Sequence, residues 1–196
     1  MPLPSTVVAN IDFLADSTLV ARQLIGVRVL IHGVGGLIVE TEAYDHDDPA
    51  SHTFGGPSVR NAAMFGPPAG IYIYRSYGIH WCINFVCREA GHGAGVLIRA
   101  LEPTDGLATM RQRRGLDDVR LLCAGPGRLG QALGIDLSYT GMRLDQPPFQ
   151  LFAAEPSAQQ MVVAGPRIGI SKAVEQPWRF GLAGSKFLSR PFRQNG

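Results

Sequence analysis

The sequence predicts an α+β fold, in which residues 1–196 form a single domain around a curved, mostly antiparallel β-sheet with three or four flanking helices and a protruding β-hairpin. A chain of 196 residues is long enough for one sizeable hydrophobic core and short for two. Short strand-like segments alternate with turns rich in glycine and proline, and helical patterns interrupt them only a few times. No repeat, low-complexity tract or linker divides the chain.

The first predicted element is a helix over residues 10–23. Asp16 or Ser17 can cap its start, and Gly26 follows its end as a stop signal. Two apolar segments come next and predict a hairpin. Its first strand, its turn and its returning strand cover residues 27–32, 33–36 and 37–44.

The returning strand, LIVETEAY, carries two carboxylates and a phenol at a spacing of two. This period places Glu40, Glu42 and Tyr44 on one face of the strand. Burying an ionised carboxylate costs several kcal/mol unless a partner compensates it, so this face is expected to border a polar cleft. An edge strand with its acidic face in water would show the same pattern, and the octapeptide alone leaves both interpretations equally open.

Residues 45–70 show no periodicity and are rich in Asp, Pro, Gly and Ser. A loop of more than about 15 residues inside a compact domain is usually functional or disordered. Apolar side chains at Phe54, Met64 and Phe65 can anchor this one, so we expect an ordered functional loop. Its potential metal ligands lack a recognised spacing, so no metal site is predicted from His46, Asp47, Asp48 or His52.

A second hairpin is predicted from strands at residues 71–76 and 80–87. Gly78 permits a positive φ in the turn, and Tyr77 lies at the tip. The tyrosine could fold back on the sheet, which the local sequence favours, or act as a wedge for a partner such as a base stack.

The next strand, residues 96–101, contains an arginine that is awkward in an apolar core. Arg99 shares a face with leucines and therefore requires a carboxylate or a phosphate as partner. Glu40 and Glu42 are the natural candidates.

Two helices are predicted after this strand. Thr104 caps the first and Gly115 follows its end. Arginines crowd its last turn, where cations suit the helix dipole and phosphate contacts are the alternative, at Arg111, Arg113 and Arg114. The second helix starts near Pro126 and ends at Gly134. The remaining strand candidates are residues 149–153, 161–164, 167–170 and 178–182.

Composition adds three constraints. The net charge is only +2, and all basic residues except Lys172 and Lys186 are arginines, a bias that suits DNA phosphates but also follows from a GC-rich genome. The cysteines, which have no CxxC spacing, are expected to be reduced, buried thiols; they are Cys82, Cys87 and Cys123. No apolar run approaches the ~20 residues of a membrane helix, and the start lacks a leader pattern, so we expect a soluble protein that is not exported.

The motifs along the chain resemble those of the alkyladenine DNA glycosylase family, also called 3-methyladenine or N-methylpurine DNA glycosylases. The resemblance covers nearly the whole chain, through IVETEAY, ASHTFGG, RNAAMF, IYIYRSYGIHWCIN, LIRALEP, TMRQRR, LCAGPGRLGQALGI, PRIGI and PWRF. It implies a single mixed α/β domain that uses neither metal nor organic cofactor. The implied activity is cleavage of the N-glycosidic bond of damaged purines.

The resemblance also assigns roles to individual residues. Glu42 matches the general base that activates the attacking water, and Arg99 the arginine that holds this water and a nearby phosphate. Asn84 matches the asparagine that shapes the pocket against the 2-amino group of guanine, and Tyr77 the tip residue that fills the gap left by a flipped base. The flipped base stacks between residues that match Tyr44, His52 and Tyr74.

The chain departs from the family pattern in two places. One residue fewer separates Tyr44 from His52 than the family spacing, which leaves open whether His52 or His46 reaches the pocket. Beside the wedge, Ile79 and His80 differ from the residues of relatives and are possible DNA contacts, as are two arginines near the end of the predicted helix, Arg111 and Arg114.

The expected partner is double-stranded DNA that contains damaged purines, bound by a monomer without membrane contact. The chain lacks the long N-terminal extension of larger eukaryotic members, so we expect a bacterial, cytoplasmic and nucleoid-associated form. Neither lysine lies in the family motifs, so water rather than an amine is the expected nucleophile. Chemistry at the sugar requires the base to leave the stack, and an electron-rich pocket favours a cationic alkylated base.

Two other functional classes remain open from the sequence. A non-catalytic nucleic-acid-binding module could share the sheet and the arginines, although it has no use for Glu42 beside Arg99. A carbohydrate hydrolase could use Glu40 and Glu42 as its carboxylate pair. No residue settles which lesions a glycosylase of this sequence accepts.

Overall fold

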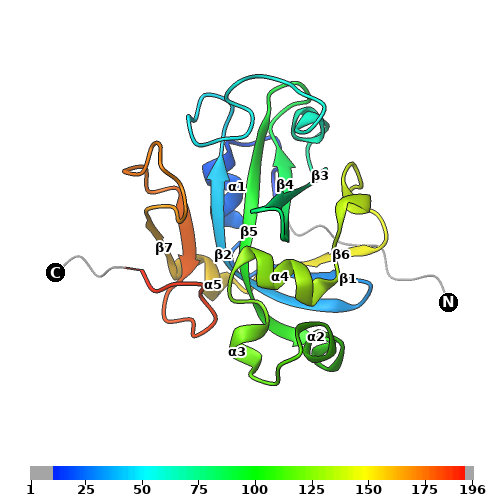
Figure 1. Ribbon diagram of the computed structural model, residues 1–196. Coiled ribbons are helices and arrows are strands. Elements are labelled where there is room, and N and C mark those ends of the chain that lie inside the picture. The colour runs from blue at the N-terminus through cyan, green and yellow to red at the C-terminus, as the bar shows by residue number, and fades with distance from the viewer. Residues whose placement is uncertain (1–10, 193–196) are drawn as a thin grey trace.

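One curled antiparallel sheet organises the chain in the computed structural model, which describes residues 11–192 (Figure 1). The main strand order is β3-β4-β5-β2-β1-β6, and β8 pairs with both β2 and β7. The strands are β1 (Arg28–Ile31), β2 (Val34–Tyr44), β3 (Ile71–Ser76), β4 (His80–Cys87), β5 (Ala94–Asp105), β6 (Phe149–Phe152), β7 (Val162–Gly165) and β8 (Arg179–Leu182). The predicted α+β class is confirmed.

Short helices pack around this sheet. Over the described residues they are α1 (Ser17–Gln23), α2 (Leu107–Arg114), α3 (Val119–Leu122), α4 (Pro126–Leu133) and α5 (Pro156–Gln160), with 3₁₀ turns at Ala62–Phe65 and Leu137–Tyr139. The sequence predicted three or four helices and missed α3 and α5, because segments of four and five residues are too short to show a helical period. No helix among residues 11–192 is long and apolar enough to cross a bilayer.

The first helix is shorter than predicted. It begins at Ser17, and residue 10 of the predicted range lies outside the described residues. Asp16 occupies the N-cap position, but its side chain makes no capping hydrogen bond. Its carboxylate instead accepts a hydrogen bond from Arg88, so an ion pair replaces the cap.

The turn predicted at residues 33–36 is wrong in its extent. His32 and Gly33 form the turn with φ values of 52° and 75°, and β2 already starts at Val34. Gly35 and Gly36 lie inside the strand, where a Cβ would come within 1.9 Å of the Val29 carbonyl oxygen and within 2.0 Å of the Glu102 carbonyl oxygen. These glycines therefore serve the close approach of neighbouring strands and do not form the turn.

The helix cap predicted at Thr104 is also wrong. β5 continues through Thr104 to Asp105, because Pro103 and Asp105, on either side of Thr104, still pair with Gly36 and Gly35 at the start of β2. Gly106, with a φ of 70°, then turns the chain into α2. The predicted ends of the two helices are confirmed, since Gly115 and Gly134 are both left-handed C-caps.

The second hairpin is confirmed and forms an exposed feature of the fold. β3 and β4 pair from Ile71↔Phe85 to Ser76↔His80, and the first two of the three turn residues, Tyr77 and Gly78, have positive φ. This geometry matches the tight turns that suit twisted hairpins. The Tyr77 side chain is 87% exposed, so the interpretation that it folds back on the sheet is wrong.

Helix α4 supports this hairpin from one side. A Cβ on Gly130 would lie 2.0 Å from the Trp81 carbonyl oxygen, and a Cβ on Gly127 would lie 2.6 Å from the His80 ring. The two glycines thus let α4 lie directly on β4, while Leu129, with no exposed surface, joins the core. Figure 1 shows α4 crossing the sheet below the β3–β4 hairpin.

The long loop after β2 is ordered, as predicted. Asn61 donates from Nδ2 to the carbonyl oxygens of His52 and Gly56, and Thr53 donates from Oγ1 to that of Gly93. Met64 is buried and anchors the loop, whereas Phe54 is exposed and does not. These bonds position the loop at the end of the sheet where β4 and β5 are also joined (Figure 1).

Candidate active site

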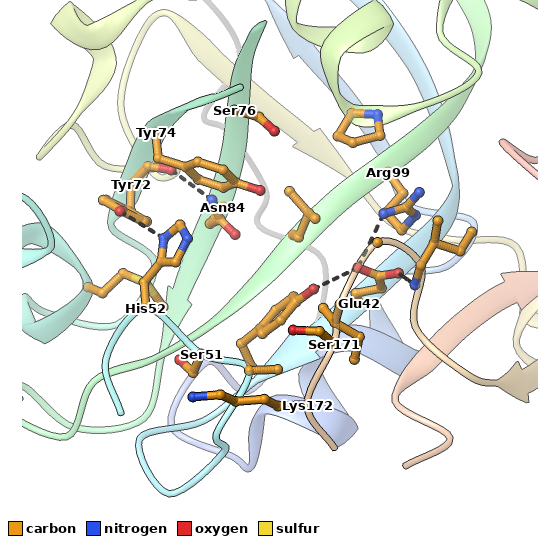
Figure 2. Close-up of a pocket in the computed structure, with 18 of the residues that line it drawn as sticks. Glu42, Ser51, His52, Tyr72, Tyr74, Ser76, Asn84, Arg99, Ser171 and Lys172 are labelled. Carbon is orange, nitrogen blue, oxygen red and sulfur yellow. Dashed lines mark hydrogen bonds and ion pairs between the residues drawn. The ribbon is translucent and has the colours of Figure 1, made fainter. Parts of the chain in front are cut away.

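A cavity of about 570 Å³ opens where β2, β5 and the β3–β4 hairpin meet the long loop and residues 168–172 (Figure 2). Its volume lies in the range of small-molecule sites. Polar and aromatic side chains dominate its wall, among them Glu42, Tyr44, Ser51, His52, Tyr72, Tyr74, Ser76, Tyr77, Asn84, Arg99, Lys172 and Arg190. The structure therefore brings together the residues that the sequence proposed for catalysis and for the base pocket.

Glu42 is part of the wall of this cavity and has no exposed surface. Its Oε2 accepts a hydrogen bond from Tyr44 Oη at 2.9 Å and lies 3.2 Å from Arg99 Nη1, while its Oε1 accepts one from the Ile168 amide at 2.7 Å. Burial raises the pKa of Glu42, and the charge of Arg99 and the Ile168 amide offset part of this shift. The carboxylate is thus less acidic than an ordinary glutamate and is fixed from three sides.

The acidic face of β2 is not a sheet edge. β2 pairs with β5 along most of its length, and around Glu40 and Glu42 it also pairs with β8. The interpretation as a solvated edge is therefore wrong, and a polar cavity borders this face as predicted. Only Glu42 and Tyr44 line that cavity, and Glu40 lies outside its wall.

Glu40 is fully buried and occupied by hydrogen-bond donors. Its Oε1 accepts from Arg99 Nε at 2.9 Å, from Arg179 Nε at 2.8 Å and from Ser189 Oγ at 2.7 Å. Its Oε2 accepts from the Ser189 amide at 2.6 Å. Glu40 therefore fixes two arginines and the C-terminal segment rather than facing the cavity.

Arg99 joins the two glutamates, and its predicted pairing with both is confirmed. The guanidinium donates to Glu40 through Nε and lies beside Glu42 with Nη1. Burial disfavours its charge, but the carboxylates of Glu42 and Glu40 outweigh this and raise the pKa of Arg99. The arginine consequently remains charged in the wall of the cavity.

Aromatic rings form the opposite wall, as Figure 2 shows. The ring centroids of His52 and Tyr74 are 4.6 Å apart in an edge-on arrangement, and the rings of Tyr72 and Tyr74 stack with centroids 6.0 Å apart. His52 Nδ1 lies 3.1 Å from Tyr72 Oη. His46 does not line this cavity, so the shorter loop still brings His52 to the wall. Tyr72 was not predicted here, although its alternation with Tyr74 along β3 indicated a shared face.

Protonation states in this wall follow from burial. Burial and the nearby charge of Arg60 lower the pKa of His52, so its imidazole is neutral at neutral pH. Burial and the Glu42 charge raise the pKa of Tyr44, which keeps its phenol a hydrogen-bond donor. The wall thus presents uncharged rings to a ligand.

Asn84 lies on β4 directly opposite Tyr72 and is 4% exposed. Its Nδ2 donates to the Tyr72 carbonyl oxygen at 3.3 Å, which fixes the plane of the carboxamide at the cavity wall. The sequence predicted this residue in the pocket, and the structure places it there.

An ion pair that the sequence did not predict stabilises the wall of the cavity. Arg167 and Asp48 pair with no exposed side-chain surface, and Arg167 Nη1 also donates to the Ala43 carbonyl oxygen at 2.9 Å. The guanidinium lies 4.7 Å from the centre of the Tyr44 ring and 5.2 Å from that of Trp178. Residues 167–170 were predicted as a strand, but they form a loop that delivers the Ile168 amide to Glu42. No local pattern links Asp48 to an arginine so distant along the chain.

Lys172 lies in none of the family motifs, but it lines the cavity. It is exposed, and its ammonium group lies on the side of Ser51, away from Glu42 (Figure 2).

The other candidate DNA contacts lie outside the inner cavity. Ile79 is 68% exposed, and with His80, which is also exposed, it extends the surface next to Tyr77. Arg111 Nε donates to the Asp117 carbonyl oxygen, and Arg114 donates to the Gln131 side chain. Neither arginine lines the cavity, and their contacts connect α2 to its neighbours.

The chain is also similar to known proteins. The family model described as methylpurine-DNA glycosylase matches residues 11–186. A protein of Nitrosospira multiformis is 70% identical over 185 residues, covering 94% of this chain and 95% of its own length, and is by name a 3-methyladenine DNA glycosylase. Proteins with the same name from Rhodopseudomonas palustris (62% over 175 residues, 89% of this chain and 86% of theirs) and Rhizobium meliloti (58% over 185 residues, 94% and 97%) are similar as well.

Proposed function

Because the chain belongs to the methylpurine-DNA glycosylase family, we propose that its cavity binds a damaged purine of double-stranded DNA and that Glu42 activates the water that hydrolyses the N-glycosidic bond. The enzyme is a DNA glycosylase, a hydrolase of the bond between base and sugar. The observation that carries the proposal is the buried Glu42 carboxylate, held by Arg99, Tyr44 and the Ile168 amide in the wall of an aromatic cavity.

The damaged base must leave the duplex to enter the cavity beside Glu42. Extrusion of a base costs a few kcal/mol, and enzymes of this kind recover it by stacking the flipped base and by filling the gap. Tyr44, His52 and Tyr74 supply rings for stacking, at about 1 to 3 kcal/mol per base–ring contact. Tyr77, 87% exposed at the hairpin tip, has the position and size of a wedge for the vacated stack.

Bond cleavage is assigned to an ionised Glu42. The transition state of glycoside hydrolysis resembles an oxocarbenium ion, which a carboxylate stabilises while it accepts a proton from water. The lone pairs that Glu42 does not use toward Arg99, Tyr44 and Ile168 are available for that water. The reaction leaves free base and an abasic site.

An amine nucleophile has weak support. A Schiff-base mechanism requires a lysine or a terminal amine at the sugar carbon. The ammonium of Lys172 lies away from Glu42, on the Ser51 side of the cavity (Figure 2). The enzyme is therefore proposed to be monofunctional, with no strand cleavage at the abasic product.

The proposed substrates are alkylated and deaminated purines. A cationic alkylated purine is attracted to the faces of tyrosine rings, and a neutral His52 adds no opposing charge. Deaminated purines are neutral, so their departure requires protonation, and their excision is expected to be slower.

The position of Glu40 speaks against the carbohydrate-hydrolase alternative. Such an enzyme needs two carboxylates that both face the scissile bond. Glu40 lies outside the cavity wall, and both of its oxygens accept hydrogen bonds from Arg99, Arg179 or Ser189. The geometry leaves a single carboxylate at the reaction position.

The test is a Glu42→Gln variant in single-turnover excision assays on duplexes with a defined alkylated purine. The amide keeps the shape but cannot act as a base, so base release is expected to fall by about 10²- to 10⁴-fold while duplex binding persists. Glu102→Gln is the matched control, since Glu102 lies on β5 outside the cavity wall. Excision by Glu42→Gln at the wild-type rate would refute the assigned role.

A further inference from the structure

A second group of potential ligands lies apart from the catalytic cavity. Asp45 and His46 directly follow β2, and His92 lies in the connection between β4 and β5. The distances are 3.1 Å from His46 Nδ1 to Asp45 Oδ1, 2.7 Å from His92 Nε2 to the same oxygen, and 3.0 Å between the two ring nitrogens. The three atoms therefore form a small triangle contributed by two distant segments of the chain.

This triangle cannot be satisfied by protons alone. A carboxylate oxygen only accepts, and each ring nitrogen either donates or accepts within its ring plane. If both nitrogens donate to Asp45, the 3.0 Å contact between His46 and His92 joins two donors. If one nitrogen donates to the other, the acceptor nitrogen faces the carboxylate with its lone pair. At most two of the three contacts are hydrogen bonds, whereas one cation at the centre makes all three favourable.

The side chains around the triangle orient two of its members. Asp45 Oδ2 accepts a hydrogen bond from Ser17 Oγ at 3.2 Å, which directs Oδ1 toward the histidines. On the far side of the His92 ring, Nδ1 lies 3.5 Å from a Glu89 carboxylate oxygen. A carboxylate on the distal nitrogen of a histidine is the usual support for a metal ligand, because it fixes the tautomer and makes the ligand more basic.

The space beside the triangle suits an additional ligand such as water. A cavity of about 240 Å³ adjoins it and is also lined by Asp16, Asp47 and Arg88. Arg88 is the one cation in this lining, and it is paired with Asp16 and lies 3.8 Å from Glu89. Uncompensated positive charge therefore does not oppose a bound cation.

We propose that Asp45, His46 and His92 bind one divalent transition-metal ion of the zinc type. Two imidazole nitrogens and one carboxylate oxygen form a mixed donor set that zinc accepts, and an open fourth position is common when three protein ligands are present. The ion joins the start of the long loop to the β4–β5 connection. It is a structural clasp for the loop that carries His52, not a participant in base release.

No pattern in the sequence indicates this site. The spacing of His46 and its neighbours in the loop matches no ligand motif. His92 follows 46 positions later, and only the meeting of two loops at one end of the sheet brings it to Asp45.

The test measures binding of Zn²⁺ alone to the chelator-treated full chain by calorimetry and by metal analysis after dialysis. One ion per chain is expected, and His46→Gln and His92→Gln are each expected to weaken binding by more than about 100-fold, since loss of a residue that only orients a ligand already costs about 10- to 100-fold. Ser17→Ala is expected to cost about tenfold for that reason. His32→Asn is the control, because His32 is an exposed histidine in the β1–β2 turn.

Two further measurements make the result decisive. X-ray absorption of the zinc-loaded chain is expected to show nitrogen and oxygen neighbours at about 2.0 to 2.1 Å and no sulfur at about 2.3 Å. Hydrogen exchange in residues 45–70 is expected to slow when Zn²⁺ is added. No binding by the intact chain, or equal binding by the wild type and both His→Gln variants, would overturn the proposal. The His46 side chain is 52% exposed, so His46→Gln remains informative even if His92→Gln fails to fold.

Discussion

Glu40 and Glu42 are two residues apart on β2 and both fully buried, but their partners differ. Glu40 receives four hydrogen bonds from Arg99, Arg179 and Ser189. Glu42 shares Arg99 and faces the cavity with its remaining capacity. One arginine thus contacts both carboxylates. Because more donors occupy Glu40, Glu42 is the carboxylate that is available for chemistry.

The raised pKa of Glu42 predicts an acid limb in the rate profile. The proposed base works only when ionised, and burial raises its pKa above the ordinary 4.5. For a permanently cationic lesion, whose departure needs no added proton, excision should fall about tenfold per pH unit below the Glu42 pKa. Single-turnover rates on such a duplex, with folding monitored by circular dichroism, test this. A rate that stays flat down to pH 4.5 would contradict it.

The buried pair of Arg167 and Asp48 predicts a large stability effect. Removing one member leaves an uncompensated buried charge, so Arg167→Met is expected to lower the free energy of unfolding by about 3 to 5 kcal/mol in urea denaturation. The double variant Arg167→Met with Asp48→Leu should recover most of this loss. Arg120→Met, which breaks an exposed pair with Asp118, should cost far less than Arg167→Met, because water screens exposed charges. Equal losses for the two single variants would show that burial does not govern the pair.

At the scale of elements, the β3–β4 hairpin and α4 form one unit. The glycines of α4 permit direct contact with the Trp81 backbone and the His80 ring, so the helix supports the base of the hairpin. The tip beyond this contact has no such support, and Tyr77 and Ile79 remain exposed there. A hairpin that is supported near α4 and has an exposed apolar tip suits insertion into a stack of DNA bases.

The hairpin tip predicts a separation of stability from function. Tyr77→Ala should change the free energy of unfolding by no more than about 0.5 kcal/mol, because the side chain is exposed. Excision from duplex DNA should fall strongly, whereas excision from single-stranded DNA, which has no opposite stack to fill, should change little. Parallel single-turnover assays on the two substrates test this, and equal losses on both would exclude a wedge.

Elements with a clear local signal were predictable from the sequence. The strands of both hairpins followed from apolar runs and from alternation, and the ends of α2 and α4 from their glycines. The helix cap predicted at Thr104 was wrong, because this residue lies inside a strand that is extended by pairing with β2. Residues 167–170 alternate like a strand, but the Arg167 ion pair holds them as a loop.

At the scale of the whole molecule, the site is assembled from segments far apart in the sequence. Two carboxylates, those of Glu40 and Glu42, receive contacts from Arg99, Ile168 and Ser189. The contact of Arg99 with the glutamates could be predicted, since a buried charge demands a partner. The contributions of Ile168 and Ser189 could not, because a backbone amide carries no residue-specific signal.

The C-terminal segment therefore predicts a global effect of truncation. A chain that ends at Phe187 loses both Ser189 donors to Glu40 and the Phe192 ring, which lies 4.0 Å from the Arg179 guanidinium. Hydrogen bonds to charged groups contribute about 1.5 to 3 kcal/mol each, so a lower Tm and weaker excision are expected. Ser189→Ala keeps the amide donor and should lose less. A truncated chain with the Tm of the full chain would contradict this.

The dependence of Glu40 on Ser189 also bears on how the protein is made. Ribosomes synthesise chains from the N-terminus, and β2 and β5 emerge long before residue 189. Until Ser189 arrives, the Glu40 carboxylate that positions Arg99 lacks two of its four donors. An unfinished chain therefore lacks part of the support that Glu40 gives to Arg99. We expect base excision to reach its full rate only when translation is nearly complete.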